Sequence, residues 1–158
     1  MQEIDRVIKQ CQDGHIEAFT TLYHHYQHDV YDLACVIMRD PTAAEDIVQE
    51  TFIAVLKKIN SFRGDSAFST WLKAITINQC RMRLRQKRFK EMLRIEHLAP
   101  AQLLRLSHQQ HEVDHTVEGK IQKENIWDLV DQLQDHLRIP LILRYRYGLS
   151  CQEIAQAM

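Results

Sequence analysis

Apolar residues recur at intervals of three and four along most of this chain, and no useful stretch alternates apolar and polar residues. That spacing places apolar side chains on one face of an α-helix, whereas a half-buried strand requires a period of two. Glycine and proline, which interrupt helices, number only four and three. The sequence therefore predicts an all-α protein, and its 45% apolar residues are enough to form a core.

Four helices are predicted in the first part of the chain, over residues 2–10, 16–38, 42–60 and 67–93. Thr42 and Glu45 have the spacing of a capping box, and Ser66 is the expected N-cap of the fourth helix. The predicted core stripes of the third and fourth helices consist of Val48, Phe52, Val55, Leu56 and Ile59, and of Phe68, Trp71, Ile75, Met82, Phe89 and Leu93. We expect one small helical domain over residues 1–94.

Residues 95–119 interrupt the helical pattern and are predicted to form a linker. A second small helical domain is predicted over residues 120–158. It includes a helix that begins at Pro140, a turn, and a helix capped by Ser150 and Glu153. This order is typical of the opening of a helix-turn-helix, whose groove-reading helix would lie beyond the last residue.

The composition excludes several classes of protein. Charged residues make up 26% and the net charge is −1, values unlike those of a disordered acidic chain. No apolar run approaches the roughly 18 residues of a membrane span, and the N-terminus lacks a signal-peptide pattern. We therefore expect a cytoplasmic protein without a membrane segment of its own.

Metal and catalytic chemistry also lack sequence support. The four cysteines are widely spaced and form no CxxC, so they are interpreted as reduced thiols. The pair His24 and His28, and the H-x2-H-x3-H motif that begins at His108, could seat a metal but are interpreted as surface histidines. No phosphate loop, nucleophile elbow or HExxH occurs. We expect no cofactor, no metal site and no enzymatic activity.

The third predicted helix has an unusual polar face. At 100° per residue, the side opposite the core gathers a mostly polar set with one apolar member. That set is Asp46, Gln49, Glu50, Ile53 and Lys57. An apolar anchor with a polar rim is typical of a protein-docking surface, although single exposed isoleucines are also common. From the helix geometry alone, both interpretations stay open.

The fourth predicted helix is strongly basic. Residues 73–94 carry eight basic side chains and one acidic, inside an otherwise acidic chain. Two rows follow helical spacing: Arg81, Arg85 and Arg88, and Arg83, Lys87, Lys90 and Arg94. Such rows let several cations meet a phosphate backbone, and the loop over residues 60–66 offers a ring and amides to unpaired bases. A solvated basic helix that binds nothing is the alternative.

A second apolar strip on the same helix consists of Ile77, Cys80 and Leu84. Because it lies away from the main stripe, something must cover it. Either the first helix of this chain or a partner protein could do so.

The quoted motifs resemble a known family. The segment AAEDIVQETFIAVLKKINSFRGDSAFSTWLKAITINQCRMRLRQKR resembles region 2 of bacterial sigma factors of the extracytoplasmic-function (ECF) group of the sigma-70 family. The segment HLRIPLILRYRYGLSCQEIAQAM resembles the first part of their region 4. The match covers residues 14–94 and 120–158, with two motifs in the right order. It implies two small helical domains that start transcription with RNA polymerase.

The resemblance also implies roles for particular residues. In that family a D-x-x-Q-E helix docks on the clamp coiled coil of the polymerase β′ subunit, and the matching positions are Asp46, Gln49 and Glu50. The next loop and helix capture the promoter minus-ten element as a single strand. The matching residues for this role are Phe62, Arg63, Asp65, Ser66, Asn78, Arg81, Arg83, Arg85, Lys87 and Arg88. Trp71 matches an aromatic of the family, and we expect it to pack in the core.

The implied partners are core RNA polymerase, promoter DNA and an anti-sigma factor. The implied function is to direct initiation by binding polymerase and by recognising and melting the minus-ten element. One alternative is a sigma-like module that binds a regulator without initiating transcription. Another is a helical RNA-binding protein that uses the basic rows, although Asp46, Gln49 and Glu50 favour polymerase binding.

Overall fold

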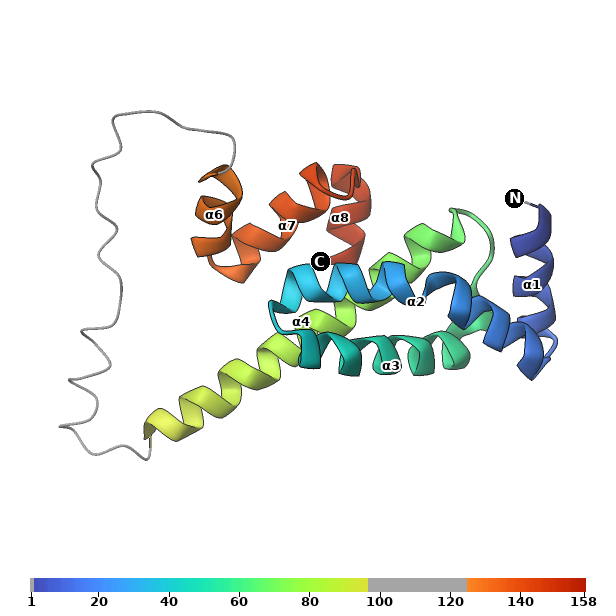
Figure 1. Ribbon diagram of the computed structural model, residues 1–158, viewed down its shortest axis with the longest axis horizontal. Helices are drawn as coiled ribbons and strands as arrows, with labels where there is room; N and C mark the ends of the chain where they lie inside the picture. Colours follow the sequence, from blue (N-terminus) through green and yellow to red (C-terminus); the bar gives the residue numbers. More distant parts are fainter. Residues whose placement is uncertain (1, 97–124) are drawn as a thin grey trace. The chain divides into compact units, whose positions relative to one another are not determined.

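The computed structural model describes residues 2–96 and 125–158, and every regular element within these ranges is helical (Figure 1). The predicted all-α class is therefore confirmed. Most of the predicted linker, including the motif that begins at His108, lies outside the described residues. No helix in the described ranges is both long enough and apolar enough to span a membrane.

The chain divides into two compact units. The first comprises Met1–Leu84 and Leu149–Met158, and the second comprises Arg85–Gly148. The helices of the first unit are α1 (Gln2–Gln12), α2 (Ile16–Met38), α3 (Pro41–Lys58), the 3-10 turn η1 (Ile59–Ser61), the N-terminal part of α4 (Phe68–Glu96) and α8 (Cys151–Ala157). The second unit holds the rest of α4, with α6 (Asn125–Gln132) and α7 (Asp135–Tyr145).

The core of the first unit is formed by one face of each of its first four helices. α2 packs along α3 and also against α1. The buried cluster includes Ile8 of α1, Leu22 of α2, Val55 of α3 and Leu72 of α4. Val55 belongs to the predicted stripe of the third helix, whereas Leu72 was not part of the stripe predicted for the fourth.

The start of α3 differs from its prediction. Asp40 is the N-cap, and its Oδ1 accepts hydrogen bonds from the backbone N–H groups of Thr42 at 3.0 Å and Ala43 at 3.2 Å. Pro41 occupies the first helical position, where its fixed φ suits the helix and its missing N–H costs nothing. The predicted capping box of Thr42 and Glu45 is therefore wrong.

α4 also begins one residue later than the predicted cap implies. The carbonyl of Ala67 accepts the first helical hydrogen bond, from Trp71 N–H at 3.2 Å, so Ser66 is not the N-cap. Phe68 and Ile75 are buried as predicted. The predicted core positions Met82, Phe89 and Leu93 are exposed instead, as is Leu56 of α3.

The second apolar strip of α4 is covered within the chain itself. Ile77 and Cys80 have no exposed surface, and Leu84 is partly buried. Burial raises the pKa of the Cys80 thiol to about 12, which keeps it protonated and unreactive at neutral pH. This strip therefore gives no support for a partner protein.

The second unit buries Ile139, Ile142 and Leu143 of α7. α7 begins at Asp135, and Pro140 lies inside it, so the predicted helix start at Pro140 is wrong. Arg138 is buried and donates to Oδ1 of Asp135 at 3.1 Å. Burial opposes ionisation of Asp135, but hydrogen bonds from arginine outweigh it and lower the pKa of that carboxyl.

The last helix starts as predicted. The Ser150 hydroxyl accepts from the backbone N–H of Glu153 at 3.2 Å, and the Glu153 carboxylate accepts from the backbone N–H of Ser150 at 2.8 Å. This reciprocal pair is the capping box that the sequence predicted. The donation from Ser150 lowers the pKa of the Glu153 carboxyl.

Candidate functional site

The outward face of α3 is the first candidate surface. We call it the α3 surface, and it consists of Asp46, Gln49, Glu50, Ile53, Leu56 and Lys57. Ile53 is 53% exposed and Leu56 is 59% exposed, while Val55 on the opposite side is fully buried. The helical periodicity of the sequence predicted the exposed Ile53 correctly but placed Leu56 in the core. The α3 surface therefore has two apolar anchors among polar side chains.

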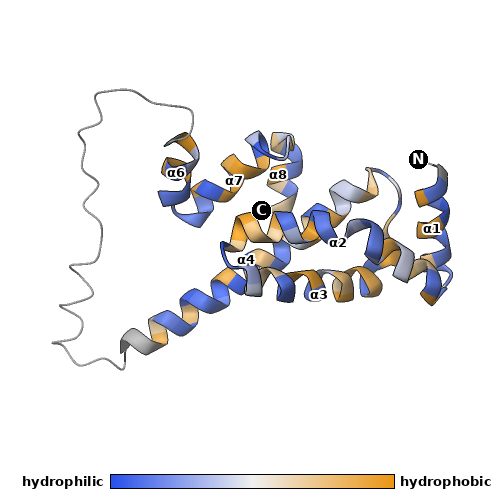
Figure 2. Cartoon of the chain, viewed as in Figure 1, coloured by the Kyte–Doolittle hydropathy of each residue, from blue (hydrophilic) through white to orange (hydrophobic). Residues whose placement is uncertain are grey.

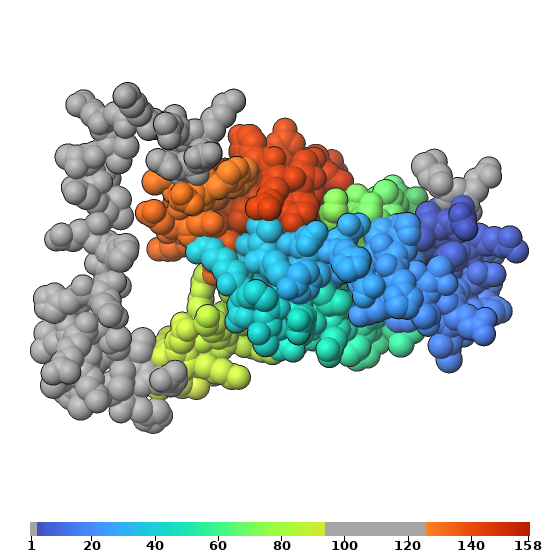
Figure 3. Space-filling view, viewed as in Figure 1, coloured from blue at the N-terminus to red at the C-terminus, as the bar shows by residue number. Residues whose placement is uncertain are grey.

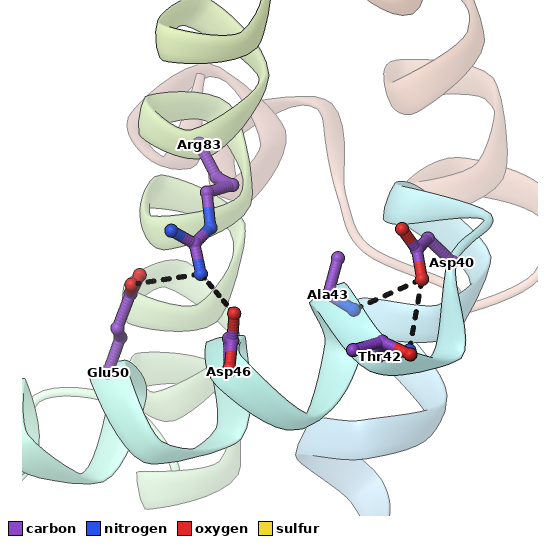
Figure 4. A network of polar contacts seen from close by, with 6 residues as sticks. All are labelled: Asp40, Thr42, Ala43, Asp46, Glu50 and Arg83. Carbon is purple, nitrogen blue, oxygen red and sulfur yellow. Dashed lines mark hydrogen bonds and ion pairs between the residues drawn. The ribbon is translucent and has the colours of Figure 1, made fainter.

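Arg83 of α4 holds the two acidic residues of this surface. Its Nη2 lies 2.5 Å from Oδ2 of Asp46 and 3.5 Å from Oε1 of Glu50 (Figure 4). Asp46 and Glu50 stand one helical turn apart, where like charges repel each other. The guanidinium lies between them and offsets that repulsion.

A groove borders the α3 surface on the side of α2. It has a volume of about 390 Å³, and α2 and α3 form one continuous surface on the face shown in Figure 3. Its lining consists of Tyr23, Gln27, His28 and Tyr31 of α2 with Glu45, Val48 and Gln49 of α3. Because Gln49 belongs to both features, a partner on the α3 surface can also reach the groove.

The loop between η1 and α4 is anchored at its first residue. Phe62 packs against Phe68 and Trp71, with ring centroids 5.4 Å and 5.3 Å apart. Gln12 of α1 donates to the carbonyl oxygens of Ile59 at 2.9 Å and Phe62 at 3.0 Å. The structure therefore gives Phe62 and Trp71 packing positions.

Beyond Phe62 the loop is open to solvent. Arg63, Asp65 and Ser66 are exposed, and Gly64 adopts a φ of 81° that favours glycine. An anchored loop start with exposed polar residues after it suits contact with a flexible ligand such as an unpaired strand.

The basic residues of α4 are not equivalent in the structure. Asn78, Arg85 and Lys87 are exposed. Within the first unit, Arg81 donates to the carbonyl oxygen of Ala157 at 3.3 Å. Within the second, Arg88 pairs with Asp135 at 2.6 Å. Polar and charged residues cover most of this part of α4 (Figure 2).

Sequence reasoning missed three features of these surfaces. The sequence does not single out Gln12, because nothing in the pattern distinguishes it from any other glutamine near the end of a helix. Leu56 was assigned to the core because the wheel places it at the edge of the apolar arc. Arg83 was grouped with the other cations, and only the fold brings it to Asp46 and Glu50.

The histidine pair of α2 stays on the surface. His24 and His28 are both exposed, and no group of three potential metal-binding side chains occurs in the described parts of the chain.

Known proteins resemble this chain over nearly its whole length. It is 30% identical over 161 residues to the RNA polymerase sigma-H factor of Pseudomonas aeruginosa, an alignment that covers 99% of this chain and 83% of the relative. It is 28% identical over 169 residues to the ECF RNA polymerase sigma-E factor of Escherichia coli K12, covering 96% and 81%. Residues 22–90 match the sigma-70 region 2 family. The chain belongs to the sigma-70 family.

Within that family, this sigma factor belongs to the ECF group. An engineered region 2 of sigmaE, solved in complex with GTAAAA, is 31% identical with a TM-score of 0.50, covering 53% of this chain and 87% of that one. CnrH, solved in complex with the cytosolic domain of CnrY, shares the fold at 21% identity with a TM-score of 0.58, covering 96% and 79%. The family is one of transcription initiation factors.

Proposed function

We propose that this sigma factor binds core RNA polymerase through the α3 surface and captures the promoter minus-ten element as a single strand. The exposed Ile53, set among Asp46, Gln49 and Glu50, is the observation that carries the proposal. An apolar anchor surrounded by polar groups is the usual centre of a protein interface. The resemblance to the D-x-x-Q-E helix names the β′ clamp coiled coil as its partner.

The DNA contacts that we propose lie on the loop and on α4. Arg63, Asp65, Ser66 and Asn78 are exposed and carry groups that can bond to base edges. Exposed cations further along α4 supply phosphate contacts, which position a strand without reading it. The complex of sigmaE region 2 with GTAAAA supports such a role for the matching part of this chain.

Phe62 contributes to this site as an anchor in our proposal. Its ring packs against two other aromatic rings, so it holds the loop in place more than it offers a free stacking face. The exposed residues that follow Phe62 can then contact the strand from a loop that is anchored at its start.

The C-terminal helices complete the proposal as the opening of region 4. The capping box of Ser150 and Glu153 starts a helix directly after a turn, as a helix-turn-helix requires. We place the protein in the cytoplasm with the polymerase. The complex of CnrH with a cytosolic domain of CnrY supports an anti-sigma partner for this chain as well.

The test measures affinity for core polymerase with the Ile53→Asp variant. A charge at the centre of the interface is expected to weaken binding by about 2 kcal/mol, or roughly 30-fold, because central anchors dominate interface energetics. Ile16→Asp is the matched control, since Ile16 is an exposed isoleucine of α2 outside the α3 surface. The unfolding midpoint of Ile53→Asp should stay unchanged because Ile53 is exposed.

Transcription from a promoter fragment that is already melted over the minus-ten element separates the alternatives. The proposed sigma factor binds polymerase and initiates on this template, and Ile53→Asp weakens both. A module that binds only a regulator would not bind polymerase at all. Unchanged polymerase affinity in a folded Ile53→Asp protein would show that the docking surface is misassigned.

A further inference from the structure

Arg83 stands in a row of cations on α4, yet its side chain is directed to α3. Its Nη2 contacts one oxygen of Asp46 and one of Glu50 (Figure 4). The two carboxylates already balance the charge of Arg83, so this side chain has less charge to offer a phosphate. Its neighbours Arg85 and Lys87 are exposed. Arg83 therefore differs from them because its charge is already paired with two carboxylates.

We propose that Arg83 is a positioning residue of the polymerase-docking surface and not a DNA contact. The inference rests on the proposed function of the α3 surface. Arg83 holds one oxygen of each carboxylate and leaves the two groups in a fixed arrangement, although both remain partly exposed to a partner. Their side chains then lose less rotational freedom when polymerase binds, which lowers the entropic cost of association.

Stability is not the main consequence of this bridge. The side chains of Arg83, Asp46 and Glu50 are 34%, 54% and 40% exposed. Ion pairs with that much solvent contact contribute little to the free energy of folding. Removing the guanidinium should therefore change the docking surface while leaving the fold intact.

The experiment uses Arg83→Met, which removes the charge but keeps a long side chain of high helix propensity. We expect affinity for core polymerase to fall about tenfold, as the loss of two pre-ordered side chains predicts. Arg6→Ala of α1 is the charge control, since Arg6 is exposed and lies outside both candidate surfaces. Its polymerase affinity should match that of the unmodified chain.

DNA binding gives a second readout, which separates a positioning role of Arg83 from a phosphate contact. With polymerase saturated by each variant, the logarithm of promoter affinity is measured against the logarithm of salt concentration. Arg83→Met should leave the slope unchanged, whereas Arg85→Met should lower it by about 0.7, the value for one single-strand phosphate contact. A decrease for Arg83→Met equal to that for Arg85→Met would overturn the proposal.

A double-mutant cycle tests whether Arg83 acts through the carboxylates. In the background of Asp46→Asn with Glu50→Gln, Arg83→Met should have no further effect on polymerase affinity. A full additional loss would mean that Arg83 touches polymerase itself, and a gain in affinity would mean that it competes with polymerase. Either result overturns the proposal.

A replacement variant and the result for Ile53→Asp make each outcome interpretable. If Arg83→Met lowers the unfolding midpoint, Arg83→Lys takes its place, because a lysine pairs with one carboxylate at a time and should lose about threefold in affinity. If Ile53→Asp weakens polymerase binding and the Arg83 variants do not, only the positioning role fails. If none of these variants changes polymerase binding, the proposed function fails.

Discussion

The α3 surface and the exposed cations Arg85 and Lys87 of α4 hold their charges differently. On α3, the carboxylates of Asp46 and Glu50 share one guanidinium, and the apolar Ile53 and Leu56 stand beside them. On α4, Arg85 and Lys87 extend into solvent. The charges of one surface are paired, and the other presents exposed cations.

This difference matches what the two kinds of partner require. A protein partner presents fixed groups, so a surface whose side chains are already ordered binds it at a lower entropic cost. A single strand is flexible and carries charge at every phosphate, so exposed cations can follow it and release its counterions. The two surfaces thus suit different ligands although they lie on helices of one protein.

Among the variants that test this comparison, Leu56→Asp on α3 should have the largest effect. If Leu56 is a second anchor, a charge there weakens core polymerase binding by about 2 kcal/mol, or roughly 30-fold. The expected unfolding free energy is unchanged, because the side chain is 59% exposed. Competition binding of the variant against the unmodified chain measures the effect.

Leu129→Asp of α6 is the matched control for Leu56→Asp. Leu129 is an exposed leucine of the second unit and lies outside the α3 surface. Equal losses for both variants would contradict a specific anchor at Leu56 and would point to a general effect of added negative charge.

The helical period predicted these elements well but not everything that packs on them. It identifies the side chains that share a face, and so it placed Phe68, Ile75 and Ile53 correctly. It does not say whether another element lies over that face. Phe89 continues the stripe of Phe68 in sequence, yet it is exposed.

Caps and ion pairs failed for a related reason. Thr42 and Glu45 have the spacing of a capping box. The helix nevertheless begins at Pro41, with Asp40 as its N-cap, because both residues favour that position. The partner of Arg83 lies 37 residues away in the sequence, so only the fold reveals it. The spacing of residues in the sequence predicts contacts within a helix, but it does not predict contacts between helices.

Replacing Arg85 and Arg88 by Ala should test the α4 side, with a smaller effect. If both cations neutralise phosphates of a melted strand, the salt slope of promoter binding falls by about 1.4. Between 50 and 200 mM salt, that change alters the salt-dependent loss of affinity by about sevenfold. The measurement is promoter affinity of the holoenzyme at several salt concentrations.

The structure sharpens this prediction at Arg88, which pairs with Asp135. A decrease near 0.7 would mean that Arg88 keeps that carboxylate when DNA is bound and that only Arg85 meets a phosphate. Arg6→Ala with Lys9→Ala on α1 removes the same charge from exposed positions elsewhere. An equal decrease in that control would contradict specific phosphate contacts on α4.

Asn78→Ala should have the smallest effect on total affinity and should change which sequences are preferred. Asn78 is exposed on α4, and its amide can both donate to and accept from a base edge. An amide has no net charge, so the salt slope should stay the same while discrimination at one promoter position falls by about 1 kcal/mol. Transcription from a library of minus-ten sequences at two salt concentrations measures both quantities. If Asn78→Ala left the preference unchanged and the Arg85 and Arg88 variant altered it, the reading and positioning roles would be reversed. That reversal would contradict the comparison itself, because the cations of α4 would then be reading sequence.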